Sequence, residues 1–133
     1  MFAHAEDKGL TTVASPYPVN VTIDRLAALA QAKNMLVFAR IDFAADAKKA
    51  GMPLHESQLL VFGNPKGGTP VMQAVPTAAL DLPLKALAWQ DEQGHVWVSY
   101  NAPEYLAARH GIASDLNKPL EGINALIKQV VEK

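Results

Sequence analysis

The segment from Gly63 to Pro70 has the clearest potential for chemistry in this chain. It reads Gly-Asn-Pro-Lys-Gly-Gly-Thr-Pro. A loop of this composition can offer backbone N–H groups to an anion, with the Lys66 ammonium and the Thr69 hydroxyl beside them and a short helix over residues 70–74. The glycine spacing matches neither a P-loop nor a dinucleotide fingerprint. A tight connection without a ligand is the favoured interpretation of the same residues.

Asp42, Glu56 and Arg40 stand at the ends of predicted strands. An acidic side chain there could serve as a general base or as a hydrogen-bond acceptor. Alternation along a strand places Arg40 and Asp42 on the same face. We therefore expect an ion pair at the surface or edge of the sheet, worth about 0–1 kcal/mol, in preference to catalysis.

The imidazole groups belong to His4, His55, His95 and His110. No two of them have the four-residue separation of a local metal pair on a helix, and the chain has no cysteine, so no metal site is predicted. His110 ends a predicted helix just before Gly111. A protonated ring is favoured there by the helix dipole and can bond to unpaired carbonyl groups, so capping is its expected role.

Aromatic residues gather around a predicted hairpin and the helix that follows it. They are Trp89, Trp97, Tyr100 and Tyr105. Trp89 and Trp97 are expected to face each other across the hairpin. The favoured interpretation is that the group builds core, and the alternative is that it lines a cavity between a curved sheet and the last helix.

Hydrophobic periodicity and chain breakers predict five strands and several helices. The strands are expected at residues 9–15, 35–43, 57–62, 84–90 and 95–100, and the last two form a hairpin. Helices are expected at residues 21–33, 44–50, 70–74, 103–110 and from 117 onward, with a further short segment between Pro76 and Pro83. The pattern predicts one α+β domain over residues 9–133, with helices on one face of a mainly antiparallel sheet, after a disordered remnant at residues 1–8.

Composition excludes several classes of partner. The 133 residues carry 12 basic and 13 acidic side chains, so the broad positive field that nucleic-acid binding requires is missing. The apolar stretches fall far short of the roughly 20 residues needed to cross a bilayer, so no membrane insertion is expected. Ala3-His4-Ala5 looks like the end of a secretory signal peptide. We predict a periplasmic protein on this ground, with a cytoplasmic location as the alternative.

Four stretches of the sequence together resemble a known set of motifs. They read FARID at 38–42, LLVFGNPKGGTPVM at 59–72, AALDLPLK at 78–85, and VSYN at 98–101 followed by YL at 105–106 and RHG at 109–111. Together they resemble the bacterial domain-of-unknown-function family numbered 302, over nearly the whole chain after Leu10.

The resemblance implies a TATA-binding-protein-like fold with the order β-α-β(4)-α, a curved antiparallel sheet, a long C-terminal helix and short helical insertions. It implies no reaction. Members of the family often carry signal peptides, which agrees with export. They also commonly have a histidine after the Arg-Ile-Asp segment and a glycine shortly beyond it, where this sequence has Phe43 and Asp46.

These observations predict a binding or accessory domain, without a cofactor, that holds a small ligand or a partner between the sheet and the C-terminal helix. The candidate ligand-binding residues are Asp42, Asn64, Lys66, Thr69, Tyr100 and His110. One alternative is an enzyme of unknown reaction with Asp42, Asn64, Thr69 and His110 around one pocket. Another is a homodimer assembled through an exposed hairpin or sheet edge.

Overall fold

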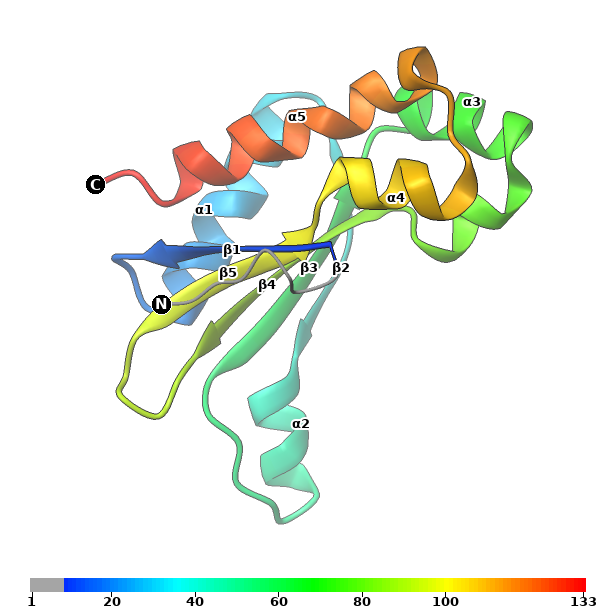
Figure 1. Ribbon diagram of the computed structural model, residues 1–133. Helices are drawn as coiled ribbons and strands as arrows, with labels where there is room; N and C mark the ends of the chain where they lie inside the picture. Colours follow the sequence, from blue (N-terminus) through cyan, green and yellow to red (C-terminus); the bar gives the residue numbers. More distant parts are fainter. Residues whose placement is uncertain (1–8) are drawn as a thin grey trace.

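Five strands form one antiparallel sheet in the order β1-β5-β4-β3-β2 (Figure 1). The computed structural model describes residues 9–133. The strands are β1 (Leu10–Ser15), β2 (Leu36–Asp42), β3 (Ser57–Gly63), β4 (Leu84–Gln90) and β5 (Val96–Asn101). The predicted α+β class and antiparallel sheet are confirmed. The predictions of disorder and of a signal-peptide remnant fall on residues 1–8, outside the described residues.

The helices are α1 (Val19–Ala32), α2 (Phe43–Lys49), α3 (Pro65–Ala74), α4 (Pro103–His110) and α5 (Ser114–Val130), with a 3₁₀ helix η1 at Pro76–Leu80. Helices α1 and α5 lie together over one face of the sheet, and α2 extends beyond the strand ends (Figure 1). Helix α1 begins two residues earlier than predicted and α5 begins three residues earlier. Both helices keep the predicted apolar stripe, because their buried residues recur at three- and four-residue intervals.

The hydrophobic core lies between the sheet and the two long helices. In β3, Leu60 and Phe62 are fully buried, and in β4 the small residues Ala86 and Ala88 are buried beside them. The helices contribute Ile23, Leu26 and Ala30 from α1 and Leu120, Ile123, Leu126, Ile127 and Val130 from α5. Burial of each large aliphatic side chain stabilises the fold by about 1.5–3 kcal/mol. This packing fixes the helices on the sheet.

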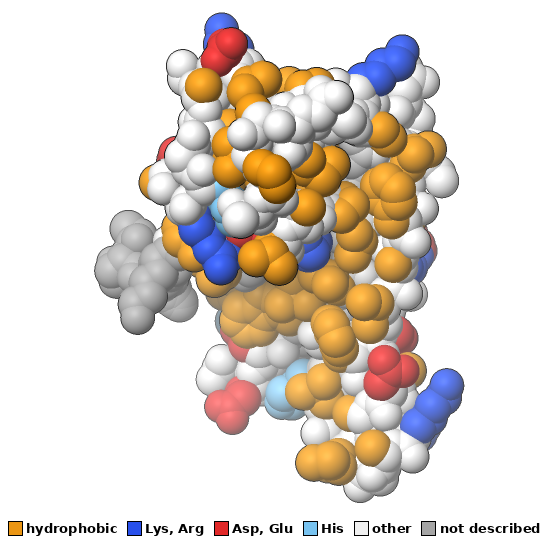
Figure 2. All heavy atoms as spheres, turned by 90° about the vertical axis from the view of Figure 1, so that its right-hand side faces the viewer, with side chains coloured by type: hydrophobic (Ala, Val, Ile, Leu, Met, Phe, Trp, Pro, Cys, Tyr) orange, Lys and Arg blue, Asp and Glu red, His pale blue; other side chains and the backbone are white. Residues whose placement is uncertain are grey.

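The opposite face of the sheet, called the open face below, is also apolar. Strand pairing aligns Ile41 with Leu59 and Leu59 with Leu87, and it sets Trp89 opposite Trp97 as predicted. The apolar residues of the open face include Ala39, Ile41, Leu59, Val61, Leu87, Trp89 and Trp97, and Lys85, Ser99 and Thr12 lie on the same face. No helix within residues 9–133 covers it, and Figure 2 shows hydrophobic side chains in a recess between projecting upper and lower parts.

Candidate functional site

A pocket of about 400 Å³ lies where the sheet, α3 and α5 meet, and it is called the α3 pocket below. Its size lies within the usual range of small-molecule sites, about 300–1,000 Å³. Gly63 and Leu84 contribute from the sheet, and Pro119 and Leu120 contribute from α5. The remaining lining residues are Met35, Phe38, Asn64, Pro65, Lys66, Gly67, Gly68, Thr69, Met72, Leu82 and Pro83. Three of the six predicted binding residues, Asn64, Lys66 and Thr69, are therefore brought together here.

Separate parts of the sequence converge on the α3 pocket. Phe38 comes from the first of the four motif stretches, Asn64 from the second and Pro83 from the third. Phe38 reaches the pocket because the pairing of β2 with β3 shifts by one residue between Val37 and Ala39. This bulge leaves Phe38 half exposed at an edge strand, where it forms one wall.

The predicted loop at residues 63–70 is in fact mostly helical. Helix α3 begins at Pro65, and the Asn64 side chain accepts a hydrogen bond from the Lys66 amide at 3.0 Å. The amides of Gly67 and Gly68 donate to the Asn64 carbonyl, each at 2.9 Å. These three amides already have acceptors within the chain, and the helix predicted from residue 70 in fact begins at Pro65.

The polar groups that remain at the α3 pocket are side chains. The ammonium of Lys66 and the hydroxyl of Thr69 belong to exposed residues in the first turns of α3. Lys66 is the one charged residue among those that line the pocket, and most of the others are apolar. This arrangement suits a molecule with an apolar body and an anionic or hydrogen-bond-accepting end.

Gly67 sets how closely α3 approaches α5. A Cβ atom at this position would lie 2.8 Å from Cβ of Pro119, which is closer than real carbon contacts allow. At the neighbouring Gly68, the nearest side-chain atom would be Cε of Met72 at 3.9 Å, an ordinary contact. The absence of a side chain at Gly67 therefore shapes the side of the pocket next to Pro119.

Asp42 lies at the other end of β2 from the α3 pocket. Leu36 pairs with Gly63 at the pocket end, whereas Asp42 pairs with Gln58. Six residue-to-residue steps along the strand separate Leu36 from Asp42, a distance of about 20 Å. Asp42 caps α2 by accepting from the Ala45 amide at 2.9 Å. The single pocket around Asp42, Asn64, Thr69 and His110, on which the enzyme alternative depended, is therefore not formed.

Arg40 and Asp42 share a face as predicted, but they do not pair directly. Arg40 binds Asp24 of α1 at 2.7 Å and the Gln58 side-chain carbonyl at 3.0 Å. The amide of Gln58 then donates to Asp42 at 3.4 Å. The predicted Arg40–Asp42 ion pair was wrong, because α1 lies over this face and supplies a closer carboxylate. Asp42 and Glu56 do line one shallow pocket next to α2.

Tyr100 belongs to the core rather than to the α3 pocket. Its side chain lies on the helix-covered face of β5, and its hydroxyl donates to Oδ1 of Asn124 in α5 at 2.8 Å. Burial raises the pKa of the Tyr100 phenol above its ordinary value. The residue links sheet and helix, so the interpretation as core holds for Tyr100, whereas Trp89 and Trp97 lie on the open face.

His110 forms a cluster with residues that the sequence did not single out. Its Nε2 lies 2.6 Å from Asp81, and its Nδ1 lies 3.1 Å from the Thr77 hydroxyl. Arg109 binds both carboxylate oxygens of Asp81, at 3.1 and 2.9 Å. Both ring nitrogens have side-chain partners, so the predicted capping of carbonyl groups was wrong. The cluster joins η1 to α4 and lines none of the three pockets described within residues 9–133.

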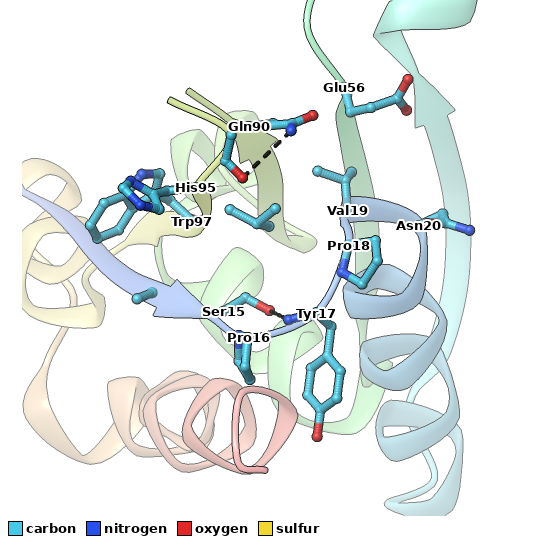
Figure 3. Close-up of a pocket in the computed structure, with 13 residues that line it drawn as sticks. Ser15, Pro16, Tyr17, Pro18, Val19, Asn20, Glu56, Gln90, His95 and Trp97 are labelled. Carbon is cyan, nitrogen blue, oxygen red and sulfur yellow. Dashed lines mark hydrogen bonds between the residues drawn. The ribbon is translucent and has the colours of Figure 1, made fainter. Parts of the chain in front are cut away.

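A wider depression lies at the strand ends farthest from α3 (Figure 3). Its volume is about 610 Å³, and it lies between the β1–α1 connection and the β4–β5 hairpin. Tyr17, Gln90, His95 and Trp97 line it, together with Glu56. The Tyr17 amide donates to the Ser15 hydroxyl at 3.2 Å, as drawn in Figure 3. None of the six predicted binding residues lines this depression.

Two general features bear on the chemistry. Within residues 9–133 there is no group of three or more His, Asp or Glu residues placed to hold a metal ion. Over the same range, no helix combines the length and apolar character needed to span a membrane.

The sequence pattern described as "Domain of unknown function DUF302" matches residues 11–130. The chain belongs to this family. The resemblance drawn from the four motif stretches is thereby confirmed. The structure is also similar to the crystal structure of an uncharacterized conserved DUF302 protein from Bacillus stearothermophilus, with a TM-score of 0.76. The similarity covers 92% of this chain and 95% of that chain, at 18% identity, so it supports the DUF302 fold.

Curated relatives match this chain over part of their own length. "Fluoride-specific ion channel FluC 1" of Brucella suis and of Brucella abortus are each 49% identical to this chain over 112 residues. The matched segment covers 83% of this chain but only 44% and 42% of those relatives. The chain therefore spans less than half the length of the curated relatives that it matches.

Proposed function

We propose that this DUF302 domain binds a small amphipathic molecule in the α3 pocket, with the apolar body of the ligand between sheet and α5 and an anionic head group beside Lys66. The observation that carries the proposal is the lining: one cation at the edge of a largely apolar pocket, on which three separate motif stretches converge.

The apolar walls favour a ligand with a hydrocarbon or aromatic body. Met35 and Met72 contribute flexible thioether side chains, which adapt to ligands of different shape. Phe38 adds an aromatic ring that is half exposed without a ligand. A ligand that covers this ring removes apolar surface from water, and the binding free energy gains about 25 cal/mol for each Å² of apolar surface buried.

Lys66 would give the site its preference for charge. Its backbone amide donates to the Asn64 side chain. Its ammonium group makes no hydrogen bond or ion pair with the other residues that the structure describes. Thr69 lies in the next turn of α3 and adds a hydroxyl that can donate or accept. The ligand class that matches these groups is a carboxylate, sulfonate or phosphate ester on an apolar chain or ring.

Calorimetric titration with decanoate and with the uncharged 1-decanol tests this function. We expect decanoate to bind more tightly than decanol, and Lys66→Met to weaken decanoate by about two- to fivefold while leaving decanol unchanged, as suits an exposed charge. Lys48→Met in α2 provides a matched control that should bind like the wild type. Equal affinities of the wild type and the Lys66 variant for decanoate would contradict the assignment of the head-group site.

A second role is favoured by the relatives. The segment similar to this chain makes up less than half of proteins named as fluoride-specific ion channels, so it is combined with a further part in those chains. We infer an accessory role for the DUF302 domain beside such a partner, with periplasmic placement as a prediction. We expect alkaline phosphatase fused after Lys133 of the natural gene product to be active, because the enzyme folds only after export, and an inactive fusion would contradict the periplasmic prediction.

A further inference from the structure

Strands β3 and β4 are apolar on both faces. Leu60 and Phe62 of β3 are buried under the helices, yet the alternate residues Leu59 and Val61 on the open face are apolar as well. Near-continuous apolar strands are typical of sheets that are covered on both sides. Within residues 9–133, helices cover only one face of the sheet. The apolar composition of the open face therefore favours its burial under a second layer.

The polar groups on the open face are already satisfied within the chain. The hydroxyls of Thr12 and Ser99 share a hydrogen bond at 2.9 Å, and the Trp89 indole N–H donates to Ser99 at 2.9 Å. The Trp97 indole N–H donates to Asp91 at 2.9 Å. A layer that packs here would therefore remove water from apolar surface without breaking polar contacts.

One charged residue, Lys85, lies among these side chains. Its ammonium group lies at the edge of the open face, near the start of β4. Its ammonium donates to the carbonyls of Asp81 and Pro83 at 3.2 and 2.9 Å. Burial lowers the pKa of Lys85, while the nearby Asp81 opposes this change. The centre of the open face thus carries no ionic group that would resist burial.

We propose that a second copy of this chain packs on the open face, with the two sheets face to face. Five strands at a spacing of about 4.8 Å and a length of about 20 Å give a footprint of roughly 500 Å² before corrugation by side chains. Exposed Phe43, Met52 and Leu54, in α2 and the loop after it, add further apolar surface near one end. A stable interface buries about 800 Å² of accessible surface per partner, so a surface of this extent is of the right order.

Basic and acidic residues lie at different places around the open face, so the basic group of one copy can meet the acidic group of a second copy. Helix α2, which follows β2, ends with Lys48 and Lys49, whereas the hairpin between β4 and β5 carries Asp91 and Glu92. A face-to-face pair requires a two-fold axis in the plane of the interface. An axis parallel to the strands would bring the lysines of one copy toward the acidic hairpin of the other, which favours self-association in this orientation.

Sedimentation equilibrium and tryptophan emission over a range of concentrations test the proposal. Both tryptophans of the chain lie on the open face, so intrinsic fluorescence reports on this surface. We expect the mass to rise from 14.3 kDa toward twice that value as the concentration increases, together with a shift of the emission to shorter wavelength. A mass of 14.3 kDa throughout, with unchanged emission, would overturn the proposal.

Leu87→Glu supplies the decisive variant, because Leu87 lies on the central strand and its side chain points away from the core. We expect its self-association to be at least about tenfold weaker, since the dimer would bury an unpaired charge. Leu80→Glu, at a residue that is 74% exposed in η1, is the matched control and should associate like the wild type. If circular dichroism shows that Leu87→Glu does not fold, Val61→Glu takes its place. A dimer that survives the folded variant, or that is weakened equally by Leu80→Glu, contradicts the assigned face.

Discussion

At the scale of single residues, His110 holds two segments of the chain together. Its side chain is 5% exposed and contacts Asp81 and Thr77. We expect His110→Ala to lower the free energy of unfolding by about 1–3 kcal/mol, because the substitution removes two hydrogen bonds and leaves Asp81 with fewer partners. His95, whose side chain is 70% exposed, is the control, and His95→Ala should cost less than about 0.5 kcal/mol. Urea unfolding measures both, and equal losses would argue against a structural role for the cluster.

Tyr100 gives the fold a dependence on alkaline pH. Burial raises the pKa of its phenol in the folded state, so the folded protein keeps this proton at pH values where the unfolded chain releases it. The resulting stabilisation is complete below about pH 10 and is lost as the pH rises through the folded-state pKa. Tyr100→Phe should be less stable at neutral pH, because it lacks the bond to Asn124, but its stability should fall less steeply above pH 10. Parallel curves for the two proteins, in urea unfolding at several pH values, would refute this assignment.

Residue types alone were enough to select Asn64, Lys66 and Thr69, which do meet at one pocket. They were not enough to find the partners of His110, because Asp81 is 29 positions away along the chain. Both residues occur within the motif stretches, which was the one available sequence signal. Contacts between distant segments depend on how η1 and α4 pack, and local patterns do not determine that packing.

At the scale of elements, the contact between α3 and α5 depends on Gly67. We expect Gly67→Ala to destabilise the protein and to weaken ligand binding in the α3 pocket, because the added methyl group would push α3 away from Pro119. Gly68→Ala provides a close comparison, since its methyl group has room. Alanine is favoured over glycine inside a helix by about 0.5–1 kcal/mol, so the Gly68 variant should be as stable as the wild type or more stable. Thermal unfolding compares the two, and a lower melting temperature for Gly68→Ala than for Gly67→Ala would refute this packing argument.

The start of α3 shows why one element was misplaced. Two glycines favour a loop, and Pro70 resembles the first residue of a helix. The same preference for proline at the first position applies to Pro65, and Asn64 before it caps the helix with its side chain. Pro70 is tolerated inside α3 although it lacks an N–H group to continue the helical hydrogen bonds. The sequence thus contained two possible helix starts, and packing against α5 favours the earlier one.

At the scale of the whole molecule, the fold class follows from the sequence more directly than the surfaces do. Apolar periods of two and of three to four residues predicted the sheet and the two long helices, because those periods reflect burial. The same periods do not show whether an apolar strand face is covered by the same chain. The α3 pocket and the open face both lie where helices leave part of the sheet uncovered. The tertiary packing of the helices determines where those places are.

The most direct test of the ligand-binding role uses the methyl groups of the methionines. Met35 and Met72 line the α3 pocket, whereas Met52 is 64% exposed in the loop after α2 and outside it. In a titration of methyl-labelled protein with decanoate, followed by NMR, we predict saturable shifts of the Met35 and Met72 signals and no shift of the Met52 signal. Shifts confined to Met52, or no saturable shift of the two pocket methionines, would contradict the assignment of a ligand to the α3 pocket.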